Sequence, residues 1–325
     1  MKRYLYLLFS LSLVLTACDD DNDQTACICP QIDAHVARVF DYRPAVGQFV
    51  NEYPKYEPGD TQEDMNRKVL EAIGGDARGL VTLGGFGGYV VVGFDHSIEN
   101  IAGLRDFRIL GNAFEGSAEP GVVMVSHDAN QNGLPDDEWY ELAGSAHQEP
   151  MTEPWLEKAK AAGNDIRVYR DYEITYHRPE VETAAENAQY IRWEDNQQRS
   201  GFKAKNSFHL QSYYPLWINE DYLTFKGTCL PQNGLDSSDE GSYFVCHKFA
   251  FGYADNDLNS SLGATFDIDW AITADGQKAN LTSIDFIKIY TGVNQENGWI
   301  GECSTEVSGV EDLHLLGEEI LTDEF

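Results

Sequence analysis

Basic residues are scarce in this sequence. Its 325 residues include 23 lysines and arginines against 54 aspartates and glutamates, which gives a formal net charge of −31. A surface of this sign repels phosphate backbones and anionic lipid headgroups. The composition therefore argues against nucleic acid as a partner, and it makes the many carboxylates potential ligands for hard cations, which prefer oxygen.

Long apolar runs are also lacking. The run at 4–15 is too short to cross a bilayer, which takes about 20 apolar residues. It follows Lys2 and Arg3, so residues 1–17 are interpreted as a signal peptide. The run ends in Leu-Thr-Ala-Cys18, which is typical of a bacterial lipobox, whose cysteine is acylated. An ordinary secretory signal with a coincidental cysteine is the alternative.

Removal of this peptide would leave a mature chain whose only attachment to a membrane is the lipid on Cys18. The peptide carries Lys2 and Arg3 and no acids, so the mature net charge becomes 21 minus 54, or −33. Residues 18–36 are predicted to be an acidic tether. Residues 37–325 are predicted to form one domain with insertions.

Recognisable catalytic motifs are absent from the sequence. It has neither a Gly-x-Ser-x-Gly elbow nor a His-Glu-x-x-His helix, and its eight histidines follow no zinc spacing. A glycosidase pair could be hidden among so many carboxylates, but the pattern singles out none. No catalytic residue is predicted, and a non-enzymatic role is favoured.

Cysteines are few, and one pair is placed for a disulfide. Cys229 and Cys246 flank a turn-rich stretch, and an exported protein meets an oxidising environment, so the pair is predicted to be bonded. Two buried free thiols are the alternative. Cys303 has no evident partner.

The rest of the chain is typical of strands and turns. The 29 glycines and the many short apolar runs, with few helical stretches between them, predict an all-β sandwich. Alternation of Phe266, Ile268 and Trp270 with other residues predicts one strand over 265–272. Helices are predicted at 61–74, where Asp60 and Glu63 have capping-box spacing, and at 154–162.

The stretch 128–138 carries the clearest chemistry. Oxygen-bearing side chains alternate at its start, Gly133 stands where a sharp turn is needed, and acids follow, as in the first half of an EF-hand calcium loop. The flanks are predicted strands, and Trp139 replaces the usual final glutamate. A solvated Asn-Gly hairpin turn is the alternative. The predicted calcium ligands are Asp128, Asn130, Asn132, Leu134 (through its carbonyl), Asp136, Asp137 and Glu138.

Two further stretches are weaker candidates. Asp255 and Asp257 lie in a polar segment that is either a second cation site or an ordinary turn. Tyr213, Tyr214 and Trp217 mix with polar groups, as in a surface that binds sugars or flat ligands, although such aromatic residues more often fill a core.

Four stretches together resemble a family of Bacteroidota cell-surface lipoproteins, often named PKD-domain or cell-surface proteins. The stretches are 84–96, 106–114, 119–138 and 284–295, and the resemblance covers most of 80–315. The acidic run 19–23 resembles the surface-export signal of such lipoproteins. No separate PKD domain is evident, which puts that part of the family label in doubt.

This resemblance implies a fold and a role. The fold implied is a jelly-roll sandwich similar to galactose-binding or carbohydrate-binding modules. The role implied is nutrient capture at the cell surface beside a TonB-dependent outer-membrane transporter. A glycan is the favoured ligand and cobalamin, or another corrinoid, the alternative. A carboxylate-dependent glycoside hydrolase and a structural or adhesive surface protein remain open.

Overall fold

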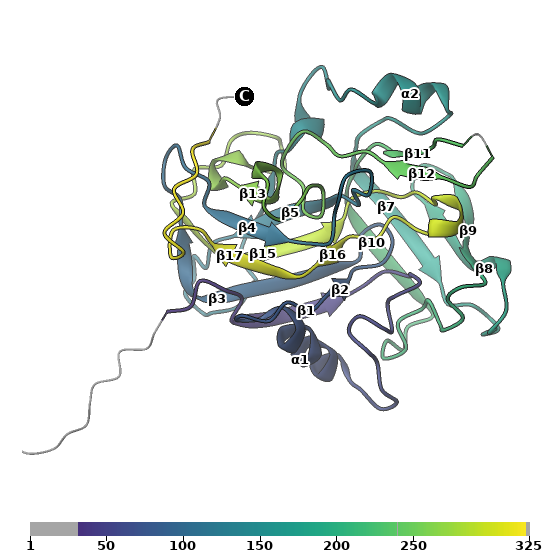
Figure 1. Cartoon of the computed structure of the whole chain (residues 1–325). Coiled ribbons are helices and arrows are strands. Elements are labelled where there is room, and N and C mark those ends of the chain that lie inside the picture. Colours follow the sequence, from purple (N-terminus) through teal and green to yellow (C-terminus); the bar gives the residue numbers. More distant parts are fainter. Residues whose placement is uncertain (1–31, 239, 323–325) are drawn as a thin grey trace, which may run out of the picture. The chain divides into compact units, whose positions relative to one another are not determined.

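A six-stranded antiparallel sheet organises the computed structural model, which describes residues 32–238 and 240–322 (Figure 1). Its strands follow the order β1-β3-β15-β5-β6-β14. Their bounds are β1 Arg38–Arg43, β3 Tyr89–Glu99, β5 Gly121–Ser126, β6 Trp139–Leu142, β14 Ala271–Ile272 and β15 Ser283–Thr291. The leader, Cys18 and the tether up to residue 31 lie outside the described residues.

The two faces of this sheet differ in burial. One face carries aliphatic side chains that are fully buried, among them Val92, Val123 and Ile287. On the other face, strand register aligns Lys288 with Met124, and Met124 with Glu141. These three side chains are only partly buried, so part of this face is left open to solvent.

A four-stranded antiparallel sheet covers another part of the second face. Its order is β10-β7-β8-β9, with β7 Tyr169–His177, β8 Asn187–Asp195, β9 Ser200–Lys205 and β10 Tyr222–Cys229. The amide of Thr228 in β10 donates to Tyr290 Oη of β15 over 2.9 Å. The Phe225 ring meets the Tyr89 ring of β3 at 6.4 Å between centroids. The two sheets therefore form the layers of a sandwich.

Smaller sheets complete the described part of the chain. They pair β13-β4-β17, β11-β12 and β16-β2. Their bounds are β2 Val81–Thr82, β4 Phe107–Leu110, β11 Gly234–Asp236, β12 Phe244–Cys246, β13 Thr265–Phe266, β16 Glu306–Val307 and β17 Gly309–Asp312. His96 of β3 lies 2.9 Å from Asp312 of β17, which ties the three-stranded sheet to the large one. The protein is an all-β sandwich, as its sequence predicts.

The sequence also predicts a jelly-roll topology, which the observed strand order does not establish. A jelly roll has eight strands arranged as two Greek keys in a double sheet. The larger sheet here has six strands, two of them only a few residues long, and several small sheets lie beside it. The jelly-roll order therefore stays a prediction.

Two α-helices lie within the described residues, both inside the predicted ranges. The first, α1, spans Gln62–Ile73 and buries Met65, Val69 and Ile73. Its capping box joins Thr61 and Asp64, one residue later than the predicted pair. The second, α2, spans Leu156–Ala161. No helix of the described residues is long and apolar enough to cross a membrane.

The single strand predicted over 265–272 is wrong. After β13 the chain turns through a 3-10 helix, η3 (Ile268–Trp270), before it re-enters the large sheet as β14. Asp267 accepts a bond from the amide of Asp269 over 2.8 Å and so caps the turn. A short polar side chain that bonds its own backbone competes with strand pairing, which the alternating pattern does not reveal. The remaining 3-10 turns are η1 (Ser145–His147), η2 (Leu262–Ala264) and η4 (Gly298–Ile300).

Candidate functional site

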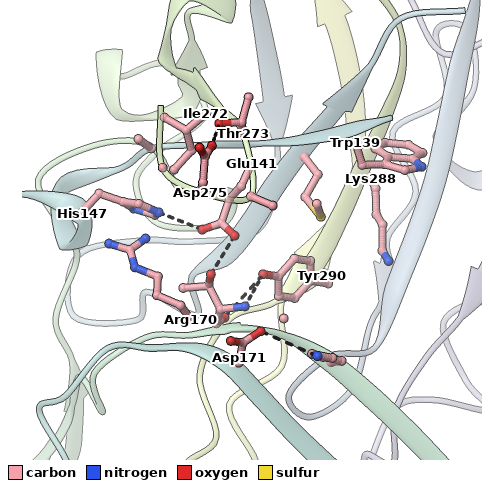
Figure 2. A pocket seen from close by; sticks show the side chains of 17 residues that line it. Trp139, Glu141, His147, Arg170, Asp171, Ile272, Thr273, Asp275, Lys288 and Tyr290 are labelled. Atoms are coloured by element: carbon pink, nitrogen blue, oxygen red, sulfur yellow. Dashed lines mark hydrogen bonds and ion pairs between the residues drawn. The ribbon is translucent and has the colours of Figure 1, made fainter. Parts of the chain in front are cut away.

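A cavity of about 720 Å³ lies where the four-stranded sheet leaves the large sheet uncovered (Figure 2). Strands β5, β6, β14 and β15 form one wall, and β7 with β10 forms the other. The turn 273–276 closes one side. The volume of the cavity falls within the range of small-molecule sites, which are about 300–1,000 Å³.

Glu141 is the central carboxylate of this pocket. Its Oε2 accepts a bond from Thr228 Oγ1 over 2.7 Å, across the gap between the two sheets. Its Oε1 lies 2.9 Å from His147 Nε2, an ion-pair contact that is drawn in Figure 2. The Thr228 bond and the His147 contact hold the carboxylate in place on the floor of the pocket.

His147 is held firmly but has an unused polar atom. Its side chain is only 8% exposed, and its Nδ1 has neither a hydrogen bond nor an ion pair among the described residues, while its Nε2 has only the ion-pair contact with Glu141, which lacks hydrogen-bond geometry. A buried ring nitrogen without a partner costs free energy that a ligand can recover. Such an atom at a pocket wall points to a missing partner in that pocket.

Cations gather in the pocket although the protein as a whole is strongly acidic. Arg170 of β7 has neither a hydrogen bond nor an ion pair within the part of the chain that the structure describes. Lys288 Nζ lies 4.2 Å above the Tyr89 ring, and burial lowers the pKa of Lys288. Lys226 is 3.7 Å from Asp171 at the exposed rim.

The pocket also offers an apolar surface and additional acceptors. Trp139 and Ile272 are partly exposed on its wall, and the Trp139 ring stacks on no other ring among the described aromatic side chains. Asp275 is exposed in the closing turn, where it accepts a bond from Thr273 Oγ1. An aromatic face beside charged and hydroxyl-binding groups is a common arrangement for sugars and other polar ligands.

The predicted calcium loop lies between β5 and β6 as a compact, hydrogen-bonded turn. Asp128 Oδ2 accepts from the amide of Gly133 over 2.8 Å, and Gly133 has a φ of 72°, the left-handed region that glycine tolerates. Asp136 Oδ1 receives the amide groups of Asn130 at 3.0 Å and Asn132 at 3.2 Å. The loop thus brings four of the predicted ligands together.

The calcium site stays a prediction, for which these side chains can supply oxygen ligands. The oxygen and nitrogen of a side-chain amide exchange places by a flip, so Asn130 and Asn132 can present their oxygens where their nitrogens now meet Asp136. Asp137 Oδ2 accepts from the backbone amide of Asn130 over 3.5 Å, at the edge of the group. Glu138 accepts a bond from Tyr140 Oη over 2.8 Å. The Leu134 carbonyl accepts the Asp136 amide over 2.9 Å.

A cluster of three carboxylates lies deeper in the fold. Oxygens of Glu119, Asp255 and Glu306 lie within 4.8 Å of one another. None of the three forms an ion pair with a basic side chain in residues 32–238 or 240–322. Burial raises the pKa of each, and the negative charge of Asp255 raises those of Glu119 and Glu306 further.

Only one half of the second predicted cation stretch reaches this cluster. Asp255, with a φ of 50°, turns inward and accepts the amides of Asn112 and Ala113 over 2.9 and 2.8 Å. Asp257 instead pairs with Lys248 at 2.6 Å. Glu119 and Glu306 carry no local sequence signal, because they approach Asp255 only through the pairing of distant segments.

Tyr213 and Tyr214 lie in the core, whereas Trp217 is largely buried and also lines a pocket beside Arg43 and Glu220. Tyr213 is 1% exposed, Tyr214 0% and Trp217 7%. The Trp217 ring stacks on Tyr42 with 5.7 Å between centroids. The prediction of a ligand-binding surface is wrong for the two tyrosines, because their rings are buried in the core.

The predicted disulfide between Cys229 and Cys246 is not formed. Both residues, like Cys303, are buried free cysteines. Cys229 ends β10 and its thiol faces the Leu230 carbonyl at 3.7 Å, whereas Cys246 ends β12 and contacts the side chain of Asn297 at 3.5 Å. The turn-rich stretch between them forms its own hairpin, β11-β12, in which Cys246 lies opposite Gly234.

Sequence patterns missed most of the pocket. Trp139 and Glu141 stand at alternate positions in the run after the calcium loop, which is a signal for one face of a strand. Arg170, His147 and Lys288 have no such signal. They come from separate elements and meet only in the folded sandwich.

Comparisons with known proteins add no family to this description. Neither the protein-family models nor the curated proteins give a match to the chain. The function therefore has to be argued from the site itself.

Proposed function

We propose that this chain is a surface-exposed lipoprotein that captures a small polar ligand, with a glycan favoured, for an outer-membrane transporter. Lipid on Cys18 would anchor it to the outer membrane, and calcium in the loop 128–138 would stabilise it. The observation that carries the capture role is the cavity of about 720 Å³ between the two sheets. Its mixture of an indole face, carboxylates and cations suits a hydroxylated ligand.

The lining groups support binding of a sugar in particular. Trp139 offers a ring face on which the apolar side of a sugar can stack, and Asp171 and Asp275 are exposed carboxylates that can accept hydroxyl hydrogens. Glu141 is already held by Thr228 and His147, so it is ordered before a ligand arrives. Preorganised acceptors lower the entropy cost of binding.

A binding screen on residues 32–325, which belong to one compact unit, tests this role. Isothermal titration with neutral and acidic oligosaccharides, and with cyanocobalamin, would identify the ligand class. We expect saturable binding of an oligosaccharide that is weakened at least tenfold by Trp139→Ala. Binding of cyanocobalamin alone would replace the glycan with the corrinoid alternative. Absence of binding by all of them would overturn the capture role.

A glycoside hydrolase is the second candidate, because three carboxylates line the same pocket. Glu141, Asp171 and Asp275 contribute from three different elements, and glycosidases work with two carboxylates on either side of the bond that breaks. Release of reducing ends from a bound oligosaccharide, abolished by Glu141→Gln while binding persists, would establish hydrolysis. Recovery of the intact sugar after long incubation would leave capture as the function.

A further inference from the structure

Because acidic residues outnumber basic ones over the whole chain, a basic side chain that has no acidic partner and lines a pocket points to an anion-binding site. With a formal net charge of −31, the surface repels anionic solutes, and an anion can bind only where local cations overcome that field. Most arginines in the described chain are already engaged with carboxylates. Arg199, for example, lies 2.7 Å from both Asp165 and Asp195. Arg170 differs, since it faces the pocket without such a partner.

His147 provides a second, independent observation at the same end of the pocket. Its imidazole is nine-tenths buried, yet its Nδ1 has no hydrogen-bond partner among the described residues. Figure 2 shows the Arg170 side chain reaching toward this ring. Glu141 Oε1 lies 2.9 Å from the opposite ring nitrogen, so the ring is held at one edge, and its Nδ1 donates to a ligand when it carries a proton.

We propose that the carboxylate of an acidic sugar binds between the Arg170 guanidinium and His147 Nδ1. This inference rests on the proposed capture role and names the ligand class for that pocket. The planar guanidinium donates two parallel N–H groups, a geometry that matches a carboxylate. His147 adds a donor from a fixed ring, and Glu141 behind it holds that ring in place.

The other end of the pocket is suited to the neutral part of such a ligand. Trp139 lies beside Lys288 on the sheet wall, away from Arg170 (Figure 2). The indole face can stack on the sugar ring. A uronic acid combines one carboxylate with a hydroxylated ring, so it uses both ends at once.

Titration calorimetry on residues 32–325 with tri-galacturonate and with the matched neutral galactose trisaccharide tests the proposal. We expect the acidic trisaccharide to bind at least tenfold more tightly than the neutral one. Arg170→Ala should remove that preference and leave affinity for the neutral sugar within about twofold. His147→Phe, which keeps a ring of similar size, should reduce the preference in the same direction.

Arg192→Ala is the matched control. Arg192 lies on β8 in an exposed pair with Glu194 at 2.8 Å, away from the residues that line the pocket, and its loss changes the net charge equally. We expect this variant to keep the full preference for the acidic sugar. Equal affinity for both sugars would overturn the acidic-sugar assignment and leave capture intact. An Arg192→Ala effect equal to that of Arg170→Ala would also overturn it, and binding of neither sugar would overturn both proposals.

Discussion

The backbone amide of Glu306 donates to the carboxylate of Asp255 over 2.9 Å, although 51 positions separate the two residues. Their side chains then share a buried space with the carboxylate of Glu119. Backbone and hydroxyl donors surround the group: Thr82 and Ser304 donate to Glu306 over 3.1 and 2.9 Å. These bonds compensate part of the cost of burying acids without a basic partner.

Stability in the presence of a chelator should fall as the pH rises from about 5 to 8. Burial raises the pKa of Glu119, Asp255 and Glu306, and that of the nearby acid Glu302 to about 8. The folded chain therefore holds protons that the unfolded chain has lost above its ordinary carboxyl pKa, near 4.5 for glutamate. The stability contribution is complete below that pH and is lost as the pH rises through the raised values. We expect the melting temperature to drop by roughly 5 °C or more.

Glu119→Gln separates this effect from general charge repulsion. Glutamine keeps an oxygen that can accept the Ser304 amide, which now donates to Glu119 over 3.0 Å. At pH 8 with chelator the variant should be more stable than the parent by about 1–3 kcal/mol, and at pH 5 the two should be nearly equal. Urea unfolding at both pH values measures the difference. An equal loss of stability at both would contradict the predicted role of the Glu119 charge.

Calcium should raise the melting temperature through the loop 128–138. The expected increase is several degrees between excess chelator and excess calcium, because an ion that binds only the folded state stabilises it by mass action. Asp128→Ala should remove most of this increase. Asp76→Ala, an exposed acid in a separate loop, and Glu119→Gln should retain it. A calcium response that survives Asp128→Ala would place the ion elsewhere.

Gly87→Ala should destabilise the sandwich strongly. A Cβ at this position would lie 2.2 Å from the Cβ of Phe225 in the opposing sheet, and Gly87 has a φ of +86°. Backbone strain of about 1–2 kcal/mol then adds to overpacking of about 1–3 kcal/mol.

Gly103→Ala measures the backbone strain of such a substitution without the overpacking expected for Gly87→Ala. Gly103 has a similar φ of +82° but nothing within 4 Å of an added Cβ, so its cost should be only about 1 kcal/mol. Urea unfolding of both variants gives the difference. Equal costs would show that the two sheets tolerate a methyl group between them.

The three cysteines of the sandwich should be unreactive in the native state. Burial raises the pKa of Cys229 and of Cys246 to about 12, so little thiolate forms at neutral pH. In residues 32–325, we expect an aromatic disulfide reagent to titrate no thiols before unfolding and three thiols afterwards, with no effect of reductant on the melting temperature. One thiol after unfolding would instead indicate a disulfide.

Local patterns in the sequence were reliable where local contacts decide the structure. The apolar spacing over 61–74 predicts α1, and Met65, Val69 and Ile73 are buried as that spacing requires. The same reasoning was wrong over 265–272, because the Asp267 side chain bonds its own backbone and turns the chain. Alternation records which residues are apolar, and it contains no information on such a bond.

Sequence patterns do not predict sites whose residues come from strands far apart in the chain. The acidic stretch around Asp255 predicts a cation site with Asp257, but Asp257 pairs with Lys248. The carboxylates that do lie beside Asp255 are those of Glu119 and Glu306, which no local pattern indicates. The turn-rich stretch between Cys229 and Cys246 and an oxidising environment predict a disulfide, yet the two residues end different strands and are free. Tyr213 and Tyr214 carry the composition of a binding surface, and only burial identifies them as core.

By itself the sequence determined the acidic character of the protein, its β-rich architecture, the first helix and the compact turn at 128–138. Each of these depends on composition or on residues that are close along the chain. Only the tertiary structure decided which face of the large sheet is left open, and therefore that Glu141, His147, Arg170 and Lys288 share a pocket. The reason is that strand pairing and sheet packing join residues far apart in sequence, and their energies depend on complementary shapes that a one-dimensional pattern does not contain.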